Sequence, residues 1–175
     1  MNDRERALQS EIEHLKTELA TKEATIYRIM HEDQFVGLGN RRKLSEKLRT
    51  KGEKALVFVD ICRVVAINAV YGPHAGDHVI KQVAVLLRQC KPTNAELFRF
   101  SGDNFAFLID APAERQGEHL AELIFSFAAH NTVIFEDVEI KPSFVIGIAY
   151  GTDTQLIRMA MAALQDAKNN GCGRY

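Results

Sequence analysis

Hydrophobic positions follow two different patterns along this chain, one before residue 33 and one after it. From Arg4 to about His31 the sequence contains no glycine or proline, and aliphatic residues recur in steps of four and three between charged residues. The aliphatic positions of this seam are Leu8, Ile12, Leu15, Leu19, Ile26 and Ile29. Lys22 takes one further position of the seam. A narrow seam with charged flanks, about four heptads long, favours a parallel coiled coil over residues 1–32.

An amphipathic helix that packs against its own domain is the alternative interpretation of this segment. Such a helix usually carries a wider apolar stripe than the one seen here. We therefore expect residues 1–32 to form a homodimer that is weakened by Lys22 and carries a signal from an upstream sensor to the rest of the chain.

Residues 33–175 have the mixed pattern of a globular domain. Hydrophobic spacing predicts helices over residues 41–49, 64–71, 74–90 and 114–129, and from a cap at 153 or 154 to about 169. Strands are predicted over residues 54–60, on both arms of a hairpin within 96–110, and over 132–140 and 143–150. Residues 54–60 are almost continuously apolar, as in a strand that is buried on both faces. Strands and helices mixed over one core predict an α+β fold, in which helices cover a central sheet.

Composition and charge exclude several classes of function. The chain has 175 residues, of which 46% are hydrophobic and 26% charged, so it can build a core and is not intrinsically disordered. Its net charge of -1 provides no basic surface for nucleic acid and no polybasic membrane anchor. The N-terminus is charged, unlike a signal peptide, and the longest apolar run, Ala55–Val59, is far too short to cross a bilayer. We expect a cytoplasmic protein without a nucleic-acid partner and without membrane contact through these residues.

Three cysteines, Cys62, Cys90 and Cys172, are scattered along the chain. An odd number with no C-x-x-C spacing is typical neither of a disulfide framework nor of a zinc site, so we expect free thiols in a reducing compartment. His74 and His78 have a spacing that can bind metal on a helix. Without a third ligand in the sequence, we interpret them as ordinary exposed or core histidines.

Six short motifs occur in the second region in a fixed order. They are Asp33–Arg41 (DQFVGLGNR), Asp60–Ile61, Asn68 with Tyr71–Gly72 and Gly76–Asp77, the hairpin Phe100–Phe105 (FSGDNF), Gly147–Ala149 (GIA), and Ala163–Leu164 with Ala167–Lys168 and Gly171. Each motif is weak alone, but six in order on the expected elements are specific. Through them the segment from Asp33 to Gly173 resembles a GGDEF domain, the fold of diguanylate cyclases. The resemblance implies a nucleotidyl-cyclase-like fold, with a mostly antiparallel sheet of about five strands wrapped by helices.

The resemblance also implies a reaction, in which two GTP molecules condense to cyclic di-GMP and release pyrophosphate. Mg²⁺ or Mn²⁺ assists such chemistry, because phosphoryl transfer depends on positioning and charge neutralisation. The metal ligands that the resemblance implies are Asp60, the carbonyl of Ile61 and Asp103, and Asp103 is also the implied catalytic base. The implied nucleotide-binding residues are Asn68 and Asp77 for guanine, Gly102 for close approach of the backbone, and Lys168 for the triphosphate. Taken singly, Asp60 could mark only the exit of a strand into solvent, and Lys168 could be an ordinary cation at a helix C-terminus.

The candidate site departs from the family pattern at several positions. Ser101 and Asn104 replace a glycine and an acidic residue of the signature, and Cys62 replaces the second aspartate of D-I-D. Val65 and Cys172 stand where the family has a lysine and an arginine that bind phosphate. Each lost cation removes a charge-assisted hydrogen bond of about 1.5–3 kcal/mol. We therefore expect a catalytically impaired regulatory and dimerisation module that binds GTP weakly or not at all. An active diguanylate cyclase with an atypical signature is the alternative.

Two further expectations follow from the resemblance. The window before the hairpin, Pro92–Ala95, lacks both charged residues of the family's R-x-x-D motif, so we expect no inhibitory site for the product. A sequence that begins within a signalling helix and stops where such a domain ends is typical of a piece of a longer protein. A downstream EAL-type phosphodiesterase domain, a common partner in the family, is therefore expected.

Overall fold

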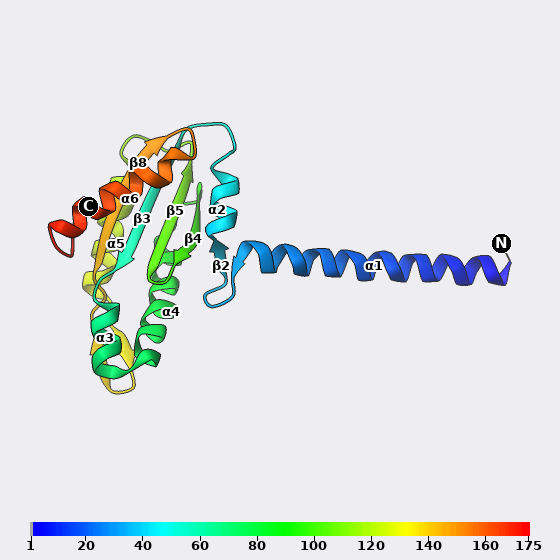
Figure 1. Ribbon diagram of the computed structural model, residues 1–175, viewed down its shortest axis with the longest axis horizontal. Helices are drawn as coiled ribbons and strands as arrows, with labels where there is room; N and C mark the ends of the chain where they lie inside the picture. The colour runs from blue at the N-terminus through cyan, green and yellow to red at the C-terminus, as the bar shows by residue number, and fades with distance from the viewer. Residues whose placement is uncertain (1) are drawn as a thin grey trace.

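The computed structural model describes residues 2–175 and shows a long helix that projects from a globular α+β domain (Figure 1). Helix α1, Asp3–His31, begins after Asn2, whose side chain accepts a hydrogen bond from the backbone of Glu5. The Glu5 carboxylate in turn accepts a hydrogen bond from the backbone of Asn2. This reciprocal capping satisfies donors that the first turn of a helix leaves without partners. At about 1.5 Å per residue, α1 is roughly 43 Å long.

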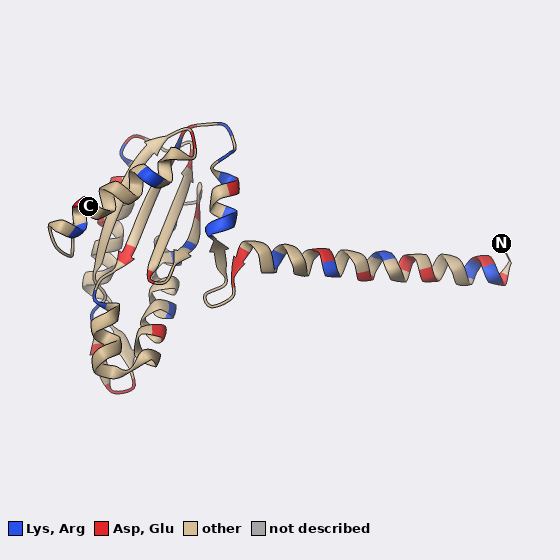
Figure 2. Ribbon diagram, viewed as in Figure 1, with Lys and Arg blue, Asp and Glu red and all other residues tan. Residues whose placement is uncertain are grey.

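Almost the whole surface of α1 is exposed. The aliphatic residues of its seam each keep 45–61% of their surface exposed: Leu8, Ile12, Leu15, Leu19, Ile26 and Ile29. Acidic and basic residues are spread along the helix between them (Figure 2). In α1 only the last residue, His31, is buried. Among residues 2–175, no helix combines the length and the apolar character needed to cross a membrane.

Polar contacts fix the end of α1 to the globular domain. Nε2 of His31 lies 2.8 Å from a carboxylate oxygen of Glu46, on helix α2 (Arg41–Lys47). The side-chain amide of Asn40 donates a hydrogen bond to the carbonyl of Met30 at 2.9 Å. The first strand begins at the residue after the helix. The helix therefore joins the domain with no loop between them.

The globular domain contains a six-stranded sheet and a separate two-stranded sheet. The strands of the large sheet are β1 (Glu32–Asp33), β2 (Leu38–Asn40), β3 (Lys54–Ile61), β4 (Ala95–Ser101), β5 (Asn104–Asp110) and β8 (Phe144–Gly151). The remaining helices are α3 (Val64–Tyr71), α4 (Pro73–Cys90), α5 (Gln116–His130) and α6 (Gln155–Asn169). The strand order is β1-β2-β4-β5-β3-β8, and every neighbouring pair is antiparallel except β2 and β4. The predicted α+β fold with a mostly antiparallel sheet is confirmed, with one strand more than expected.

The prediction of a single strand over residues 132–140 was wrong. The structure has two short strands there, β6 (Val133–Phe135) and β7 (Val138–Ile140), which pair with each other outside the central sheet. Glu136, between them, has a φ of +52°. A positive φ reverses the chain in a tight hairpin turn, so the two halves of the predicted strand fold back on each other.

Strand β3 is central in the sheet and buried along its whole length. Val57 and Val59 belong to a core that includes residues of α4 and α5. Leu56 and Phe58 belong to a second core, shared with α2 and α6. Because successive residues of a strand point to opposite faces, Asp60 points to the same face as Leu56 and Phe58. This is the face that α6 covers.

Helix α6 lies close to the sheet because Gly147 of β8 has no side chain. A Cβ atom at this position would overlap backbone atoms of Ala160 and Leu164 on α6. The buried stripe of the helix consists of Leu156, Ala160, Leu164 and Ala167. This packing brings the last turn of α6 to the end of β3, where Lys168 contacts Asp60.

Candidate functional site

The turn of the β4–β5 hairpin lies beside the end of β3. Asp60, the last but one residue of β3, is the cross-strand partner of Asn104. The backbone N–H of Ile61 donates a hydrogen bond to the carbonyl of Asp103 at 3.2 Å. Gly102 has a φ of +47° in this turn, a conformation that glycine adopts without strain. The structure thus places Asp60 and Asp103 side by side at one end of the sheet.

Asp60 is a buried carboxylate, with 7% of its surface exposed. Burial raises the pKa of Asp60 above its ordinary value, and the negative charge of Asp103 acts in the same direction. Lys168 and Asn104 oppose this rise in pKa through hydrogen bonds to the charged form. Asn104 also donates a hydrogen bond to Oδ1 of Asp103 at 3.0 Å. The net rise in pKa shows that burial, which disfavours the charged carboxylate, outweighs the stabilisation that Lys168 and Asn104 provide.

The oxygen atoms at this site suit a hard divalent cation. Two carboxylates and a backbone carbonyl are ligands of the type that Mg²⁺ and Mn²⁺ prefer. Within residues 2–175, no three His, Cys, Asp or Glu side chains form a group that could hold a metal ion. A cation here would therefore rest on Asp60, Ile61 and Asp103 together with oxygens of a nucleotide. Mg²⁺ commonly binds in this way, through one or two carboxylates and substrate phosphates.

Lys168 extends from the last turn of α6 onto the sheet. Its ammonium group donates a hydrogen bond to Oδ2 of Asp60 at 2.6 Å, and its side chain is 37% exposed. An ordinary cation at a helix end would not need this contact with a buried carboxylate. The same contact occupies one oxygen of an implied metal ligand. The contact leaves other donors of the ammonium group for a triphosphate, but it neutralises part of the positive charge that Lys168 offers.

The predicted guanine-binding pair lies where α3 meets α4. Oδ1 of Asn68, on α3, accepts a hydrogen bond from the backbone N–H of Gly76 at 3.0 Å, and Asp77, the next residue of α4, is exposed. A Cβ atom at Gly76 would overlap the side chain of Asn68, so glycine is required for this contact. The amide nitrogen of Asn68 has no hydrogen-bond partner within the described residues. An amide donor beside a carboxylate is complementary to O6 and to the N1 and N2 donors of guanine. Since α3 follows β3 closely, this pair belongs to the same end of the sheet as the carboxylates (Figure 1).

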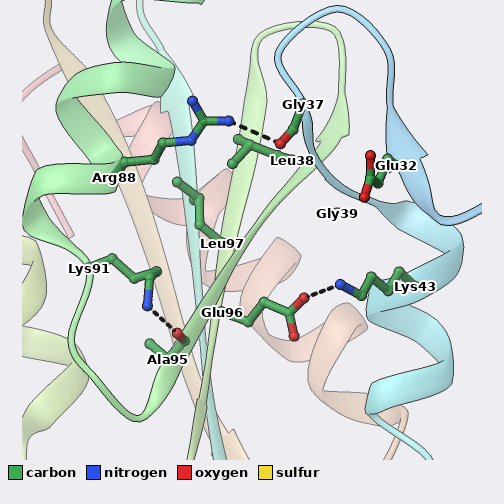
Figure 3. A pocket seen from close by; sticks show the side chains of 10 residues that line it. All are labelled: Glu32, Gly37, Leu38, Gly39, Lys43, Arg88, Lys91, Ala95, Glu96 and Leu97. Carbon is green, nitrogen blue, oxygen red and sulfur yellow. Dashed lines mark hydrogen bonds and ion pairs between the residues drawn. The ribbon is translucent and has the colours of Figure 1, made fainter. Parts of the chain in front are cut away.

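A separate pocket of about 410 Å³ lies beside the window where the family's inhibitory motif would be (Figure 3). Ala95 takes the acidic position of that motif. Two cations that line the pocket are engaged by backbone carbonyls. Arg88 donates to the carbonyl of Gly37 at 3.0 Å, and Lys91 donates to that of Ala95 at 2.9 Å. These contacts occupy part of the hydrogen-bonding capacity of the two cations. The absence of an inhibitory site stays a prediction.

The positions of the two missing phosphate-binding cations differ in their surroundings. Val65 is an 81% exposed apolar side chain on α3 that supplies no charge. Cys172 is bonded to Cys62 in a disulfide that joins positions 110 residues apart. The prediction of free thiols was therefore wrong for these two cysteines, and of the three only Cys90 is free.

The pairing of Cys62 with Cys172 is a product of the tertiary structure. Cys62 directly follows β3, and Cys172 lies just beyond the end of α6. Since α6 packs on β3 with these two ends together, the Cα atoms are 6.5 Å apart, within the range that a disulfide can bridge. Sequence spacing alone contains no sign of this proximity.

Arg174 is a cation near this end of the sheet that the motif comparison missed. It forms an isolated bridge with Val145 of β8, and the backbone N–H of Ile146 donates to its carbonyl at 3.0 Å. Val145 is also the cross-strand partner of Asp60, so Arg174, Val145 and Asp60 form one row across the end of the sheet. With strands about 4.8 Å apart, the backbone of Arg174 lies roughly 10 Å from that of Asp60. In the sequence, the one sign of Arg174 is that it is a basic residue two positions after Cys172, which stands where the family has an arginine.

Comparison with known proteins agrees with this fold. The family model described as "Diguanylate cyclase, GGDEF domain" matches residues 30–174, and the chain belongs to this family. The structure of the coiled coil and GGDEF domain of DgcB from Caulobacter crescentus, in complex with c-di-GMP, matches with a TM-score of 0.81 and 20% identity, over 96% of this chain and 94% of that one. The diguanylate cyclase SiaD from Pseudomonas aeruginosa, in complex with its activator SiaC, matches with a TM-score of 0.79 and 19% identity, over 98% and 70% of the two chains. At these identities the two structures establish the fold.

Similar sequences include uncharacterized membrane proteins of Staphylococcus aureus, from strains USA300 and NCTC 8325. They are 32% identical over 140 residues, which cover 73% of this chain and 39% of each relative. The chain thus spans about two fifths of the length of these curated relatives.

Proposed function

We propose that residues 33–175 are a degenerate GGDEF domain of a cyclic di-GMP signalling protein and that residues 1–32 are its dimerisation helix. In this proposal the domain binds GTP with Mg²⁺ or Mn²⁺, turns it over slowly or not at all, and acts by controlling a neighbouring domain. The observation that carries the proposal is the ion pair between Lys168 and Asp60. The one triphosphate cation that remains of the family pattern is bound to an implied metal ligand.

The charges around the site support impaired catalysis. Val65 and Cys172 supply no positive charge to a triphosphate, and Asn104 supplies no negative charge beside the metal site. Transition-state stabilisation relies on charges that are already in place before the reaction, more than on binding alone. A domain in which the remaining triphosphate cation is paired with an implied metal ligand lacks part of this preorganisation.

The remaining polar residues support nucleotide binding. In the proposal Asp60, the Ile61 carbonyl and Asp103 hold the divalent cation, which when bound offsets the charge of the triphosphate. In the active alternative, Asp103 is assigned to take the proton of an attacking hydroxyl. The nucleotide contacts are assigned to Asn68 and Asp77 at guanine, to the backbone at Gly102, and to Lys168 and Arg174 at the phosphates.

The exposed seam of α1 supports a homodimer. Six aliphatic side chains that are each about half exposed form a narrow stripe, and a second copy of the helix would cover them. In the proposal this parallel dimer passes a signal from an upstream sensor, and a downstream EAL-type domain in a longer, cytoplasmic protein receives it. The match to only part of the length of the Staphylococcus relatives is in line with additional segments.

An active diguanylate cyclase is the second candidate function. The observation that favours it is the preserved pair of carboxylates, since Asp60 and Asp103 lie together as the chemistry requires. In this alternative, Lys168 releases Asp60 when GTP and the metal arrive.

One experiment separates the two candidates. The purified protein is incubated with GTP and Mg²⁺ or Mn²⁺, cyclic di-GMP is followed by chromatography, and GTP binding is measured by calorimetry in parallel. We expect GTP binding that weakens in Asn68→Ala and Asp77→Ala, without measurable turnover. Turnover that disappears in Asp103→Ala would instead establish the active enzyme, and absence of binding would leave dimerisation as the role of the domain.

A further inference from the structure

The disulfide between Cys62 and Cys172 connects the two elements that build the nucleotide site. Cys62 follows Asp60 by two residues, and Cys172 follows Lys168 by four. The bond therefore ties the strand that carries the implied metal ligands to the segment after the helix that carries the implied triphosphate cation. Both cysteines also occupy positions at which the family has charged residues of the site. The disulfide thus lies beside the proposed nucleotide site rather than far from it.

The segment that the disulfide anchors has few other attachments. Residues 171–175 are all exposed. Their backbone is held by two hydrogen bonds to β8, from Gly173 N–H to the Phe144 carbonyl at 2.7 Å and from Ile146 N–H to the Arg174 carbonyl at 3.0 Å. The hydroxyl of Tyr175 adds a hydrogen bond to Glu122 at 3.1 Å. The Tyr175 ring also stacks on that of Phe125, and the Gly171 N–H donates a hydrogen bond to the Lys168 carbonyl. Without the covalent bond, the segment would depend on these noncovalent contacts.

The two sulfur atoms differ in their access to solvent. Cys172 is exposed, whereas 7% of the surface of Cys62 is exposed. A thiolate reductant can therefore reach Sγ of Cys172 and release Cys62 as the leaving thiolate. The third cysteine, Cys90, is buried with 3% of its surface exposed, and burial raises the pKa of its thiol to about 11, so it is protected from this exchange.

We propose that Cys62 and Cys172 are a reversible thiol–disulfide pair that controls the access of GTP to this site, an inference that rests on the proposed function. A dithiol reductant of the thioredoxin type attacks Cys172, forms a mixed disulfide and is then oxidised to its own intramolecular disulfide. The protein gains two electrons and two protons and ends with two thiols. A disulfide oxidant such as oxidised glutathione reverses the exchange and takes the two electrons and two protons back.

The oxidised form binds nucleotide more weakly in this proposal. In this form the disulfide adds a covalent link, beside the packing of α6, between the end of β3 and the chain after Lys168, whose ammonium group lies 2.6 Å from the Asp60 carboxylate. In the proposal this link favours the ion pair. Reduction releases the segment beyond α6 and with it the constraint on the last turn of the helix. Lys168 then exchanges Asp60 for a phosphate oxygen. Since this makes one charge-assisted hydrogen bond available to the nucleotide, reduction should tighten GTP binding about tenfold.

The test compares the oxidised and reduced protein directly. The protein is equilibrated with oxidised glutathione or with dithiothreitol, and its thiols are counted after unfolding with a chromogenic disulfide reagent. We expect one thiol in the oxidised sample and three in the reduced sample. GTP binding in the presence of Mg²⁺ is then measured by calorimetry on both samples, and the reduced sample should bind about tenfold more tightly.

Two variants serve as controls. Cys172→Ser removes the exposed partner and should bind GTP like the reduced protein whatever the redox treatment, whereas Cys90→Ala should keep the difference between the treatments. Three thiols after oxidation, or equal GTP affinity in both samples of the unaltered protein, would refute the inference alone. Absence of GTP binding in both samples would refute the proposed nucleotide binding and with it the redox control of that binding.

Discussion

Replacement of Lys168 by methionine should destabilise the protein by an amount that depends on pH. The substitution keeps a long side chain and removes the ammonium group that lies 2.6 Å from Oδ2 of Asp60. A hydrogen bond to a charged group contributes about 1.5–3 kcal/mol, but the Lys168 side chain is 37% exposed, so solvent screens part of it. We expect Lys168→Met to lower the free energy of unfolding by about 1–2 kcal/mol at pH 7.

The pH dependence follows from the direction of the pKa shift at Asp60. Its pKa in the folded protein is raised, mainly by burial, so the folded state binds a proton more readily than the unfolded state. The stability that this protonation provides is present at low pH and is lost as the pH rises through the folded pKa. Lys168 lowers that pKa, and its removal raises it further. The loss in Lys168→Met should therefore shrink as the pH falls from 7 to 4.

Urea denaturation at pH 7 and pH 4 measures this difference. Lys141→Met is the matched control, because Lys141 is exposed and has no ion pair within residues 2–175. Asp60→Asn, added to Lys168→Met, should recover much of the loss at pH 7, since the amide needs no counter-ion. A loss in Lys168→Met that is the same at both pH values, or no larger than in Lys141→Met, would refute the electrostatic reasoning.

Three further predictions test other parts of the structure. In sedimentation equilibrium, Leu15→Lys should convert the proposed dimer to a monomer, whereas Glu11→Lys, which lies outside the seam, should not. If the unaltered protein were monomeric at tens of micromolar, the coiled coil would be contradicted. Gly147→Ala should lower the free energy of unfolding, measured in urea, by about 1–3 kcal/mol, because the added Cβ meets the backbone of α6. Gly151→Ala should be nearly neutral, because a Cβ atom there makes only ordinary van der Waals contacts. Equal effects of the two substitutions would contradict the close packing of α6. Gly76→Ala should displace the Asn68 side chain and weaken GTP binding in calorimetry, with little effect on the binding of free triphosphate. Unchanged GTP affinity would show that Asn68 does not contact the nucleotide.

Ordered motifs made the centre of the site predictable from the sequence. Asp60 ends a continuously apolar segment and Asp103 lies in the turn of a hairpin with aromatic arms. Both elements have strong local signals, and a buried central strand beside a hairpin leaves few arrangements for their ends. The structure accordingly places Asp103, in the turn that precedes β5, next to the end of β3 that carries Asp60.

The parts that could not be predicted depend on contacts between distant segments. The disulfide joins Cys62 to Cys172 through the packing of α6 on the sheet, which residue spacing does not report. Arg174 lies near this end of the sheet only because the chain beyond α6 returns to the edge of β8. The hairpin of β6 and β7 was missed because Glu136 is an unusual residue at a positive φ, where glycine or asparagine would have signalled a turn.

The junction of α1 with the domain has a mechanical consequence. His31 is buried against Glu46, and Asn40 holds the carbonyl of Met30, so the last turn of the helix is anchored with no loop to absorb torsion. A stiff rod of roughly 43 Å that is fixed to a compact body at one end behaves as a lever. In a dimer, a twist of the two rods about each other would therefore swing both globular domains by the same angle, and the nucleotide sites of the two domains would approach or separate without any change inside either one.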